Sequence, residues 1–264
     1  MNRVDGFYER RDETTFESTP ATAGPWGPQA QHAGPPSALL TGEIERHHVA
    51  DGQRLGGVSV DILAPIPVAP ITVTTSVVRP GRRTALIQAT GVVGERPVLS
   101  VRAWRLARVD DDYPAVDPTP PVLDTDPDHA QDGGVIPGAN TDGYLAATQF
   151  RFTTGSFAEF GPAAAWGRSL CALVAGEEPS PWQRVLILAD SSSGMSLAAH
   201  PGRFPAINAD LHVVLHRDPV GDWIGIDAVT HSMPGHGAAA YARLSDTTGL
   251  IGTCAQTLYA STVR

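Results

Sequence analysis

The amino-acid sequence predicts an α+β fold built from two similar modules in one chain of 264 residues. A strand, a helix and then an antiparallel series of strands are predicted twice, once in each half of the chain. The halves also match at a constant spacing, and a segment rich in Asp, Pro and Gly separates them. A helix wrapped by a curved antiparallel sheet, present twice, is the arrangement called a double hotdog.

The sequence of the first half, residues 1–109, predicts one module. A strand is expected over Phe7–Ser18, and apolar residues at helical spacing predict a helix over Ser37–His48. Four strands follow, at Gly57–Leu63, Ile71–Val78, Thr84–Val93 and Val98–Ala107. The last two are expected to form a hairpin that turns at Gly94–Pro97.

The second half, residues 144–264, repeats this order after a predicted linker of residues 110–143. Ser180 suits the N-cap of a helix and Pro181 its first turn, so a helix is expected from there to about Asp190. Strands are expected at Ala147–Phe152, Ile207–Leu215, Trp223–Val229, Ala238–Leu244 and Leu250–Tyr259, with an apolar stretch at Ala163–Val174.

Internal duplication is the simplest explanation for the match between the halves. A spacing of 152 positions pairs Ala103 with Ala255. The same spacing sets Gln256 against Trp104, so only the second module is expected to carry a polar group at this position. We therefore expect one active site per chain.

Composition excludes several classes of protein. The net charge of −9 argues against nucleic acid as a partner, because nucleic-acid binding needs a basic surface. All 19 basic residues are arginines, so an anionic ligand must be held by guanidinium groups, backbone amides or helix ends. Cys171 and Cys254 form no CxxC pair, which argues against structural zinc and a disulfide framework.

The location of the chain is expected to be cytoplasmic. No stretch of about 18 apolar residues is present, so no membrane span is expected. The charged first residues lack the apolar core of a signal peptide. No cofactor and no metal ion are expected either.

Gln256 is the first candidate for chemistry. On its strand it shares parity with Leu250, Cys254 and Leu258, so its side chain should face inward. A buried primary amide must find partners for two donors and one acceptor oxygen. The alternative is a glutamine that nearby backbone groups satisfy.

Asp190 stands at the end of the second-half helix. A carboxylate at the negative end of the helix dipole is disfavoured by roughly 0.3–1 kcal/mol. A carboxylate whose anion is destabilised accepts a proton more readily, so Asp190 is a candidate general base. The alternative is a surface aspartate in a Ser-rich turn.

Asn208 opens an alternating strand and can donate a hydrogen bond to a water or accept one from it. Parity places it opposite the apolar face, so it can join an inward-facing site only through a bulge or the interface between modules. Asp210, His212 and His216 share its face and are an alternative metal site, although alternate Cβ atoms on a strand lie about 7 Å apart.

His32, Ala33 and Gly34 precede the first-half helix. Helix N-termini offer free N–H groups and positive potential, which suit an oxyanion. Pro35 and Pro36 have no N–H, so the three preceding residues are the candidates, and an ordinary loop is the alternative.

Four segments together resemble a known family: TPATAGPWGPQAQHAGPPSALL, VDILAPIPVAPITVTTSVVRPGRR, INADLHVVLHRDPVGDWIGIDA and GTCAQTLYA. They resemble the acyl-CoA thioesterase II family, most closely its actinobacterial, double-hotdog branch. The resemblance covers nearly the whole chain outside the linker. It implies an acyl-CoA or acyl-carrier thioester as the substrate and a homodimer as the assembly.

The resemblance also implies site residues. Family members use an Asp, a hydroxyl residue and a Gln to activate the water that attacks the thioester, and these fall on Asp190, Asn208 and Gln256. Asn208 departs from the family pattern because an amide cannot relay a proton. The family's His-Gly-Gly is His32-Ala33-Gly34 here, a second departure.

Three other functions remain open. A hotdog enoyl-CoA hydratase or dehydratase would need a D-x-N-P-x-H segment, which the sequence lacks. A non-catalytic acyl-thioester-binding protein of the same fold is the second alternative. A serine hydrolase is the third, but no G-x-S-x-G motif is present.

Overall fold

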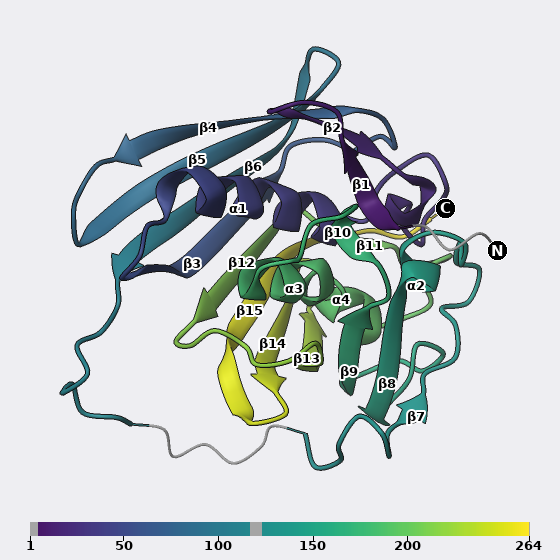
Figure 1. The fold of residues 1–264 in the computed structure, drawn as a ribbon. Helices are drawn as coiled ribbons and strands as arrows, with labels where there is room; N and C mark the ends of the chain where they lie inside the picture. The colour runs from purple at the N-terminus through teal and green to yellow at the C-terminus, as the bar shows by residue number, and fades with distance from the viewer. Residues whose placement is uncertain (1–4, 117–122, 264) are drawn as a thin grey trace.

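The computed structural model describes residues 5–116 and 123–263 (Figure 1). Two long helices, α1 (Gly34–His48) and α3 (Pro181–Ala189), lie inside one strongly curved sheet. The predicted α+β double hotdog is confirmed. No helix among the described residues is long and apolar enough to cross a membrane.

The first half has the predicted order of elements, with two differences. Its strands are β1 (Gly6–Arg10), β2 (Thr15–Ser18), β3 (Gln53–Ile62), β4 (Ile71–Arg79), β5 (Thr84–Val93) and β6 (Arg96–Ala107). The single strand expected over Phe7–Ser18 is wrong, because Asp12 accepts hydrogen bonds from the Thr14 and Thr15 amides and turns the chain into a hairpin. Helix α1 begins at Gly34, three residues before the predicted start at Ser37. Pro35 and Pro36 fit its first turn, where backbone N–H groups have no partner within the helix and their absence costs nothing.

The second half repeats this order around α3. Its elements are β7 (Gln131–Asp132), α2 (Tyr144–Ala147), β8 (Thr148–Thr154), β9 (Ala163–Ser169), β10 (Ala172–Val174), α4 (Ser192–Met195), β11 (Ala206–Asn208), β12 (Asp210–Leu215), β13 (Ile224–Ser232), β14 (Ala238–Asp246) and β15 (Gly249–Ala260). Ser180 caps α3, as predicted, and forms a capping box with Gln183. The strand expected over Ile207–Leu215 is interrupted at Ala209.

The strands of the two halves correspond at a spacing of 153 positions, not the predicted 152. Strands β4 and β6 recur at this spacing as β13 and β15, and β3 recurs as β11 with β12. Trp104 is therefore not the counterpart of Gln256: its side chain is 42% exposed on the outer face. The counterpart is Ala103, which is buried as Gln256 is.

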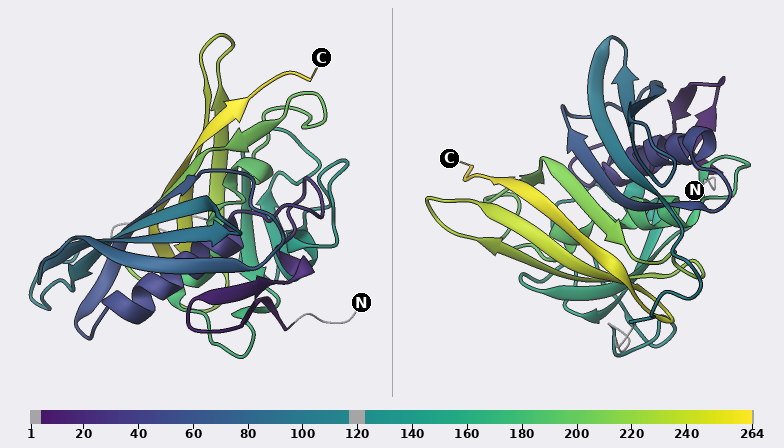
Figure 2. Two further views of the ribbon diagram at one scale, coloured as in Figure 1. Left: turned by 90° about the horizontal axis from the view of Figure 1, so that it is seen from above. Right: turned by 90° about the vertical axis from the view of Figure 1, so that its left-hand side faces the viewer.

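Antiparallel pairing of β3 with β12 joins the two halves into one sheet, and helices α1 and α3 pack against each other inside it (Figure 2). At the other side, β1 of the first half pairs in parallel with β10 of the second. The interface between the two halves is thus closed by backbone hydrogen bonds on both sides.

The predicted linker is only partly an open connector. Residues 117–122 lie outside the described residues. Leu123 and Ala130 pack against Trp166 on the outer face of the sheet, and Ile136 joins the main core. The division of the chain at residues 109 and 143 stays a prediction.

Glu45 on α1 gives a test of packing between the halves. Ser180 donates a hydrogen bond of 2.5 Å to its carboxylate, and burial raises the pKa of Glu45 from 4.5 to about 7. The folded state therefore retains a proton that the unfolded state releases, so stability is lost as the pH rises from 4.5 through 7. At pH 8 the free energy of unfolding of the Glu45→Gln variant should therefore be about 2–3 kcal/mol higher than that of the wild type.

Urea unfolding at pH 4.5 and pH 8 measures this difference. The two proteins should differ little at pH 4.5, where Glu45 is protonated in the folded state and half protonated in the unfolded state. Equal free energies of unfolding at pH 8 would contradict the raised pKa of the Glu45 carboxyl.

Candidate active site

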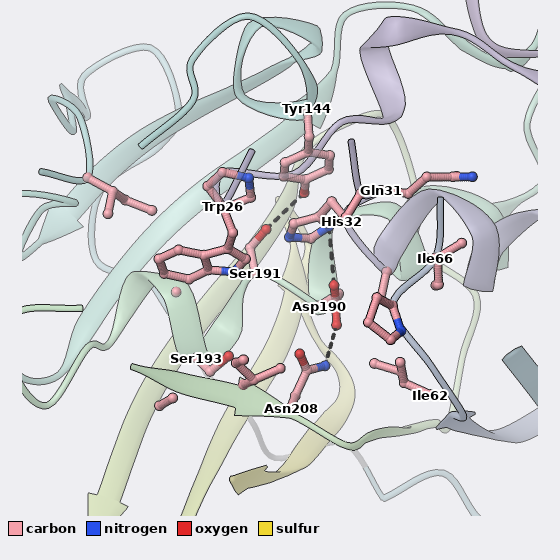
Figure 3. Close-up of a pocket in the computed structure, with 18 of the residues that line it drawn as sticks. Trp26, Gln31, His32, Ile62, Ile66, Tyr144, Asp190, Ser191, Ser193 and Asn208 are labelled. Carbon is pink, nitrogen blue, oxygen red and sulfur yellow. Dashed lines mark hydrogen bonds and ion pairs between the residues drawn. The ribbon is translucent and has the colours of Figure 1, made fainter. Parts of the chain in front are cut away.

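A cavity of about 430 Å³ lies between the two halves (Figure 3). Most of its wall is apolar, with Ile62 and Ile66 from the first half and Leu145, Phe157 and Leu197 from the second. Five polar side chains gather at one place in this wall: His32, Asp190, Ser191, Ser193 and Asn208. An apolar cavity with a few converging polar groups is typical of a small-molecule site.

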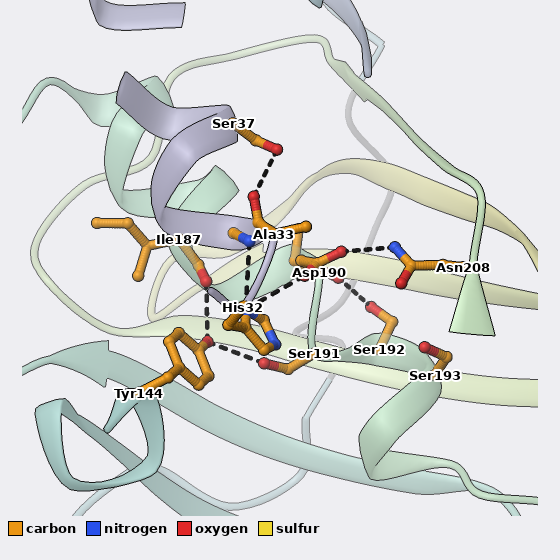
Figure 4. A network of polar contacts seen from close by, with 12 residues as sticks. His32, Ala33, Ser37, Tyr144, Ile187, Asp190, Ser191, Ser192, Ser193 and Asn208 are labelled. Carbon is orange, nitrogen blue, oxygen red and sulfur yellow. Dashed lines mark hydrogen bonds and ion pairs between the residues drawn. The ribbon is translucent and has the colours of Figure 1, made fainter. Parts of the chain in front are cut away.

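Asp190 is the C-cap of α3 and is buried, with 6% of its surface exposed. Its Oδ1 accepts hydrogen bonds from Asn208 Nδ2 at 2.7 Å and from Gln256 Nε2 at 3.2 Å. These donors compensate for the unfavourable end of the helix dipole. The structure thus brings together the three side chains Asp190, Asn208 and Gln256, which are far apart in sequence. Figure 4 shows the contact between Asp190 and Asn208.

Asn208 reaches Asp190 because the strand bulges beside it. The register changes from Asn208 opposite Leu258 to His212 opposite Ala255, which leaves one extra residue in the β11–β12 segment. Ile207 and Ala209 are consequently exposed, and Asn208 faces inward together with Leu211. The Oδ1 atom of Asn208 makes no hydrogen bond within the described residues, so it can accept one from a water.

The first half has the same bulge, at Gly56 of β3. Leu55 there occupies the place of Asn208, and Ala103 occupies the place of Gln256. Both are buried apolar residues. The corresponding site in the first half therefore lacks two of its three polar groups, which supports the expectation of one site per chain.

Gln256 is 2% exposed and all of its polar atoms are engaged. Its Oε1 accepts a hydrogen bond from the Ser193 amide at 3.0 Å, and its Nε2 also donates to the Asp190 carbonyl at 3.1 Å. It lies behind Asp190 and does not line the cavity. Gln256 is thus placed to orient the carboxylate of Asp190 and the first turn of α4.

The parity expected for the Gln256 strand holds only in part. Cys254 and Leu258 are buried with Gln256, but Leu250 is only half-buried and Ile251 is fully buried. Leu244 pairs with Gly252 and Ser245 with Leu250, so Ile251 is the extra residue of a bulge. This bulge reverses the alternation at the start of β15.

His32 lies beside Asp190 rather than in the free position expected of an oxyanion donor. Its Nδ1 is 3.2 Å from Asp190 Oδ2 and also 3.2 Å from the Gly34 amide nitrogen. Burial lowers the pKa of His32, and the opposing effect of Asp190 is smaller, so the ring is neutral. The carboxylate is the stronger partner, so we assign the single ring proton to Nδ1, which then donates to Asp190 and does not accept the Gly34 N–H.

Ala33 lines the cavity, whereas Gly34 does not. The Gly34 N–H points at His32, and a Cβ at Gly34 would lie 2.3 Å from the Ile187 carbonyl oxygen. Gly34 therefore allows α1 to approach α3 closely. The Ala33 amide has no hydrogen-bond acceptor in the described chain and is the N–H at this helix end that remains open to a ligand.

Tyr144 is a site residue that the sequence analysis missed. Its ring stacks on His32 at 3.7 Å between centroids, with the planes 2° apart (Figure 4). Its hydroxyl donates to the Ile187 carbonyl at 2.8 Å and therefore accepts the bond from Ser191 Oγ, also at 2.8 Å. The only signal in the sequence was one aromatic residue at the end of the Gly- and Asp-rich linker.

For the thioester hydrolysis that the sequence predicts, Tyr144→Phe should lower kcat by about tenfold, which is the scale of one lost hydrogen bond in a buried network. The ring remains stacked on His32, but Ser191 and the carbonyl of Ile187 lose their common partner. Steady-state kinetics with thermal unfolding as a control measures the effect. An unchanged kcat would show that the hydroxyl only fills space.

The alternative metal site at Asp210, His212 and His216 does not form. Asp210 Oδ1 accepts a hydrogen bond from the Thr257 amide at 2.6 Å and so holds the bulge. His212 contacts Ser59 of the first half. Residues 5–116 and 123–263 contain no group of three His, Cys, Asp or Glu side chains that could hold a metal ion.

Comparison with known proteins supplies a family. The sequence matches the family model of the acyl-CoA thioesterase N-terminal domain over residues 22–106 and that of the C-terminal domain over residues 116–260. None of the curated protein sequences compared with the chain matches it.

Solved structures show the same fold. A hot dog fold protein from Alicyclobacillus acidocaldarius is 16% identical, with 98% of each chain covered and a TM-score of 0.76. A protein assigned as a thioesterase II from Thermobifida fusca is also 16% identical, with 98% of this chain and 96% of that chain covered and a TM-score of 0.74. One assigned as a thioesterase from Novosphingobium aromaticivorans is 20% identical, with 96% and 97% covered and a TM-score of 0.70.

Proposed function

We propose that this chain, which belongs to the acyl-CoA thioesterase family, hydrolyses an acyl-CoA thioester to the free acid and CoA by direct attack of water. One observation carries the proposal. Asp190, a buried carboxylate held by Asn208 and Gln256, faces an apolar cavity between the two halves. Such a carboxylate is suited to accept a proton from a water beside an acyl group.

In the proposed reaction a water lies between the Asp190 carboxylate and Asn208 Oδ1. Asp190 takes one proton of this water as its oxygen bonds to the thioester carbon, and the carbonyl oxygen gains negative charge. The free amide of Ala33, at the positive end of α1, donates to that oxygen. The intermediate then expels the CoA thiolate, which receives the proton from Asp190.

Asn208 needs no hydroxyl for this role. Its Nδ2 donates to Asp190, which fixes the orientation of the amide and leaves Oδ1 as an acceptor for the water. The water then directs one proton at Oδ1 and the other at Asp190. The acyl chain would lie along the apolar wall, beyond the methyl group of Ala33.

Assay of the purified protein against acyl-CoAs of different chain length, with free thiol detected, tests the proposal. Thiol release that saturates with at least one acyl-CoA is the expected result. Saturable binding without thiol release would instead indicate a non-catalytic acyl-thioester-binding protein. Conversion of an enoyl-CoA to the hydroxyacyl-CoA would indicate a hydratase.

Direct attack predicts that no acyl-enzyme accumulates. Burial raises the pKa of the Cys254 thiol to about 11, and the pKa of Cys171 is also raised by burial, so neither is a thiolate at neutral pH. The Ser191 hydroxyl donates to Tyr144, and no hydrogen bond joins it to a base among the described residues. Mass spectrometry of protein quenched during turnover should show the unmodified mass, and a mass raised by one acyl group would refute direct attack.

A further inference from the structure

A second cavity, of about 570 Å³, adjoins the first at the edge of β8. Leu145 and Phe157 line both cavities, so the two cavities meet at these side chains. Strand β7 covers this edge only opposite Arg151 and Phe152, which leaves the start of β8 without a strand partner on that side (Figure 1).

Two arginines line the second cavity on one face of the sheet. Gln149 pairs with Arg168 across β8 and β9, and Arg151 lies two residues further along β8. The two arginine positions are thus diagonal neighbours, about 7–8 Å apart at the backbone. Both side chains are half-buried.

Neither arginine has a carboxylate partner in the described chain. Arg168 donates to the neutral Gln149 at 2.8 Å, and its guanidinium lies 4.5 Å from the Trp223 ring centroid. Arg151 forms no hydrogen bond or ion pair with any described residue. Arg10 and Arg243, in contrast, pair with acidic residues at 3 Å or less. Two half-buried cations without an anion favour an anionic ligand.

The remaining wall has one opposing charge. Asp132 lines the cavity and faces Arg151 across β7 and β8, but it forms no ion pair with either arginine in the described structure. Gly133 and Gly134 line the cavity beside it; Gly133 is buried, and Gly134 is exposed with a positive φ of 66°. Asp132 should therefore weaken the binding of an anion that the two arginines favour.

We propose that the second cavity binds a phosphate group of the carrier half of the thioester, with the pantetheine arm passing Leu145 and Phe157 toward Asp190. This inference rests on the proposed function. The chain has no lysine, so arginines are the side chains with a permanent positive charge that can bind the phosphate. The shared chemistry is the phosphate next to pantetheine, which occurs in CoA and in the phosphopantetheine arm of a carrier protein.

Calorimetric titration with free CoA tests the site without hydrolysis. Arg151→Gln should raise Kd about tenfold, the scale of one charge-assisted hydrogen bond, and leaves no protein group unpaired. Asp132→Asn should lower Kd severalfold. Arg102→Gln, which removes an equal charge from the outer face of the first half, is the matched control and should change Kd by less than about twofold.

Kinetics with two substrates locates the effect on the phosphate. Arg151→Gln should raise KM for acyl-CoA about tenfold and leave the hydrolysis of an acyl-N-acetylcysteamine, which has no phosphate, unchanged. Titration with phosphopantetheine and with a phosphopantetheinylated carrier protein separates the two sources. A preference for CoA over both assigns part of the binding to its nucleotide, and equal affinities assign it to the shared phosphate.

Kd values for CoA that are unaffected by both Arg151→Gln and Asp132→Asn would overturn the site, whatever the hydrolysis rate. If Arg151→Gln does not fold, Asp132→Asn decides alone, because its effect has the opposite sign. If both Kd changes are found but the protein releases no thiol, the phosphate site is supported and the proposed hydrolysis is refuted.

Discussion

Replacement of Asp190 by asparagine is expected to lower kcat for thioester hydrolysis by about 10²- to 10⁴-fold. The amide cannot take a proton from water. It nevertheless fits the site, because its oxygen can accept from Asn208 and Gln256 while its NH₂ group faces His32. His32 can then carry its proton on Nε2 and accept at Nδ1, so folding should be preserved.

Two measurements belong to this prediction: kcat on the best acyl-CoA of the panel, and the midpoint of thermal unfolding. Asp227→Asn is the matched control, since Asp227 pairs with Arg243 on the outer face of the sheet and is remote from the cavity. The control should keep wild-type kcat. A kcat near wild type in Asp190→Asn would assign the base to another group.

Strand positions were well predicted because alternation and turn residues are local signals. The limits of β5 agree with the prediction at both ends, and the Ser180 cap lies where the sequence places it. The hairpin of β1 and β2 was missed because its turn is polar but contains no glycine or proline. An Asp12 side chain that binds two backbone amides supplies the turn instead.

The errors in predicting which side chains of a strand point inward have one physical origin. Single-residue bulges at Gly56, Ala209 and Ile251 each reverse which side chains point inward, and no local pattern marks them. The spacing of 152 is a separate error, because the bulges at Gly56 and Ala209 recur at 153 positions and do not shift one half against the other. That spacing set Trp104 against Gln256, whereas strand parity placed Asn208 on the outer face.

Site contacts were harder to predict because they are long-range. Asp190 and Gln256 were identified from a helix end and from strand parity, which are local features. The contact of His32 with Asp190 joins the two halves, and it depends on the close approach of α1 and α3 that Gly34 permits. Tyr144 stacks on His32 from a segment whose composition predicts only a connector.

Replacement of Gln256 by leucine should lower both the activity and the stability of the protein. Leucine leaves the Ser193 amide without its buried acceptor and removes both donors to Asp190. An unsatisfied buried group costs about 1–3 kcal/mol, so the free energy of unfolding should fall by that amount. Because Gln256 does not line the cavity, kcat should fall about 10²-fold while KM stays near wild type.

Gln256→Glu separates the two contributions at alkaline pH, where the introduced carboxyl is ionised: it still accepts the Ser193 N–H but cannot donate to Asp190. If Gln256 acts by orienting the base, the glutamate variant should lose at least as much kcat as Gln256→Leu, because a second negative charge then faces Asp190. If Gln256 acts only by holding α4, the glutamate variant should instead regain most of the activity. Urea unfolding and steady-state kinetics on both variants distinguish the two roles, and a rise in KM with unchanged kcat would contradict both.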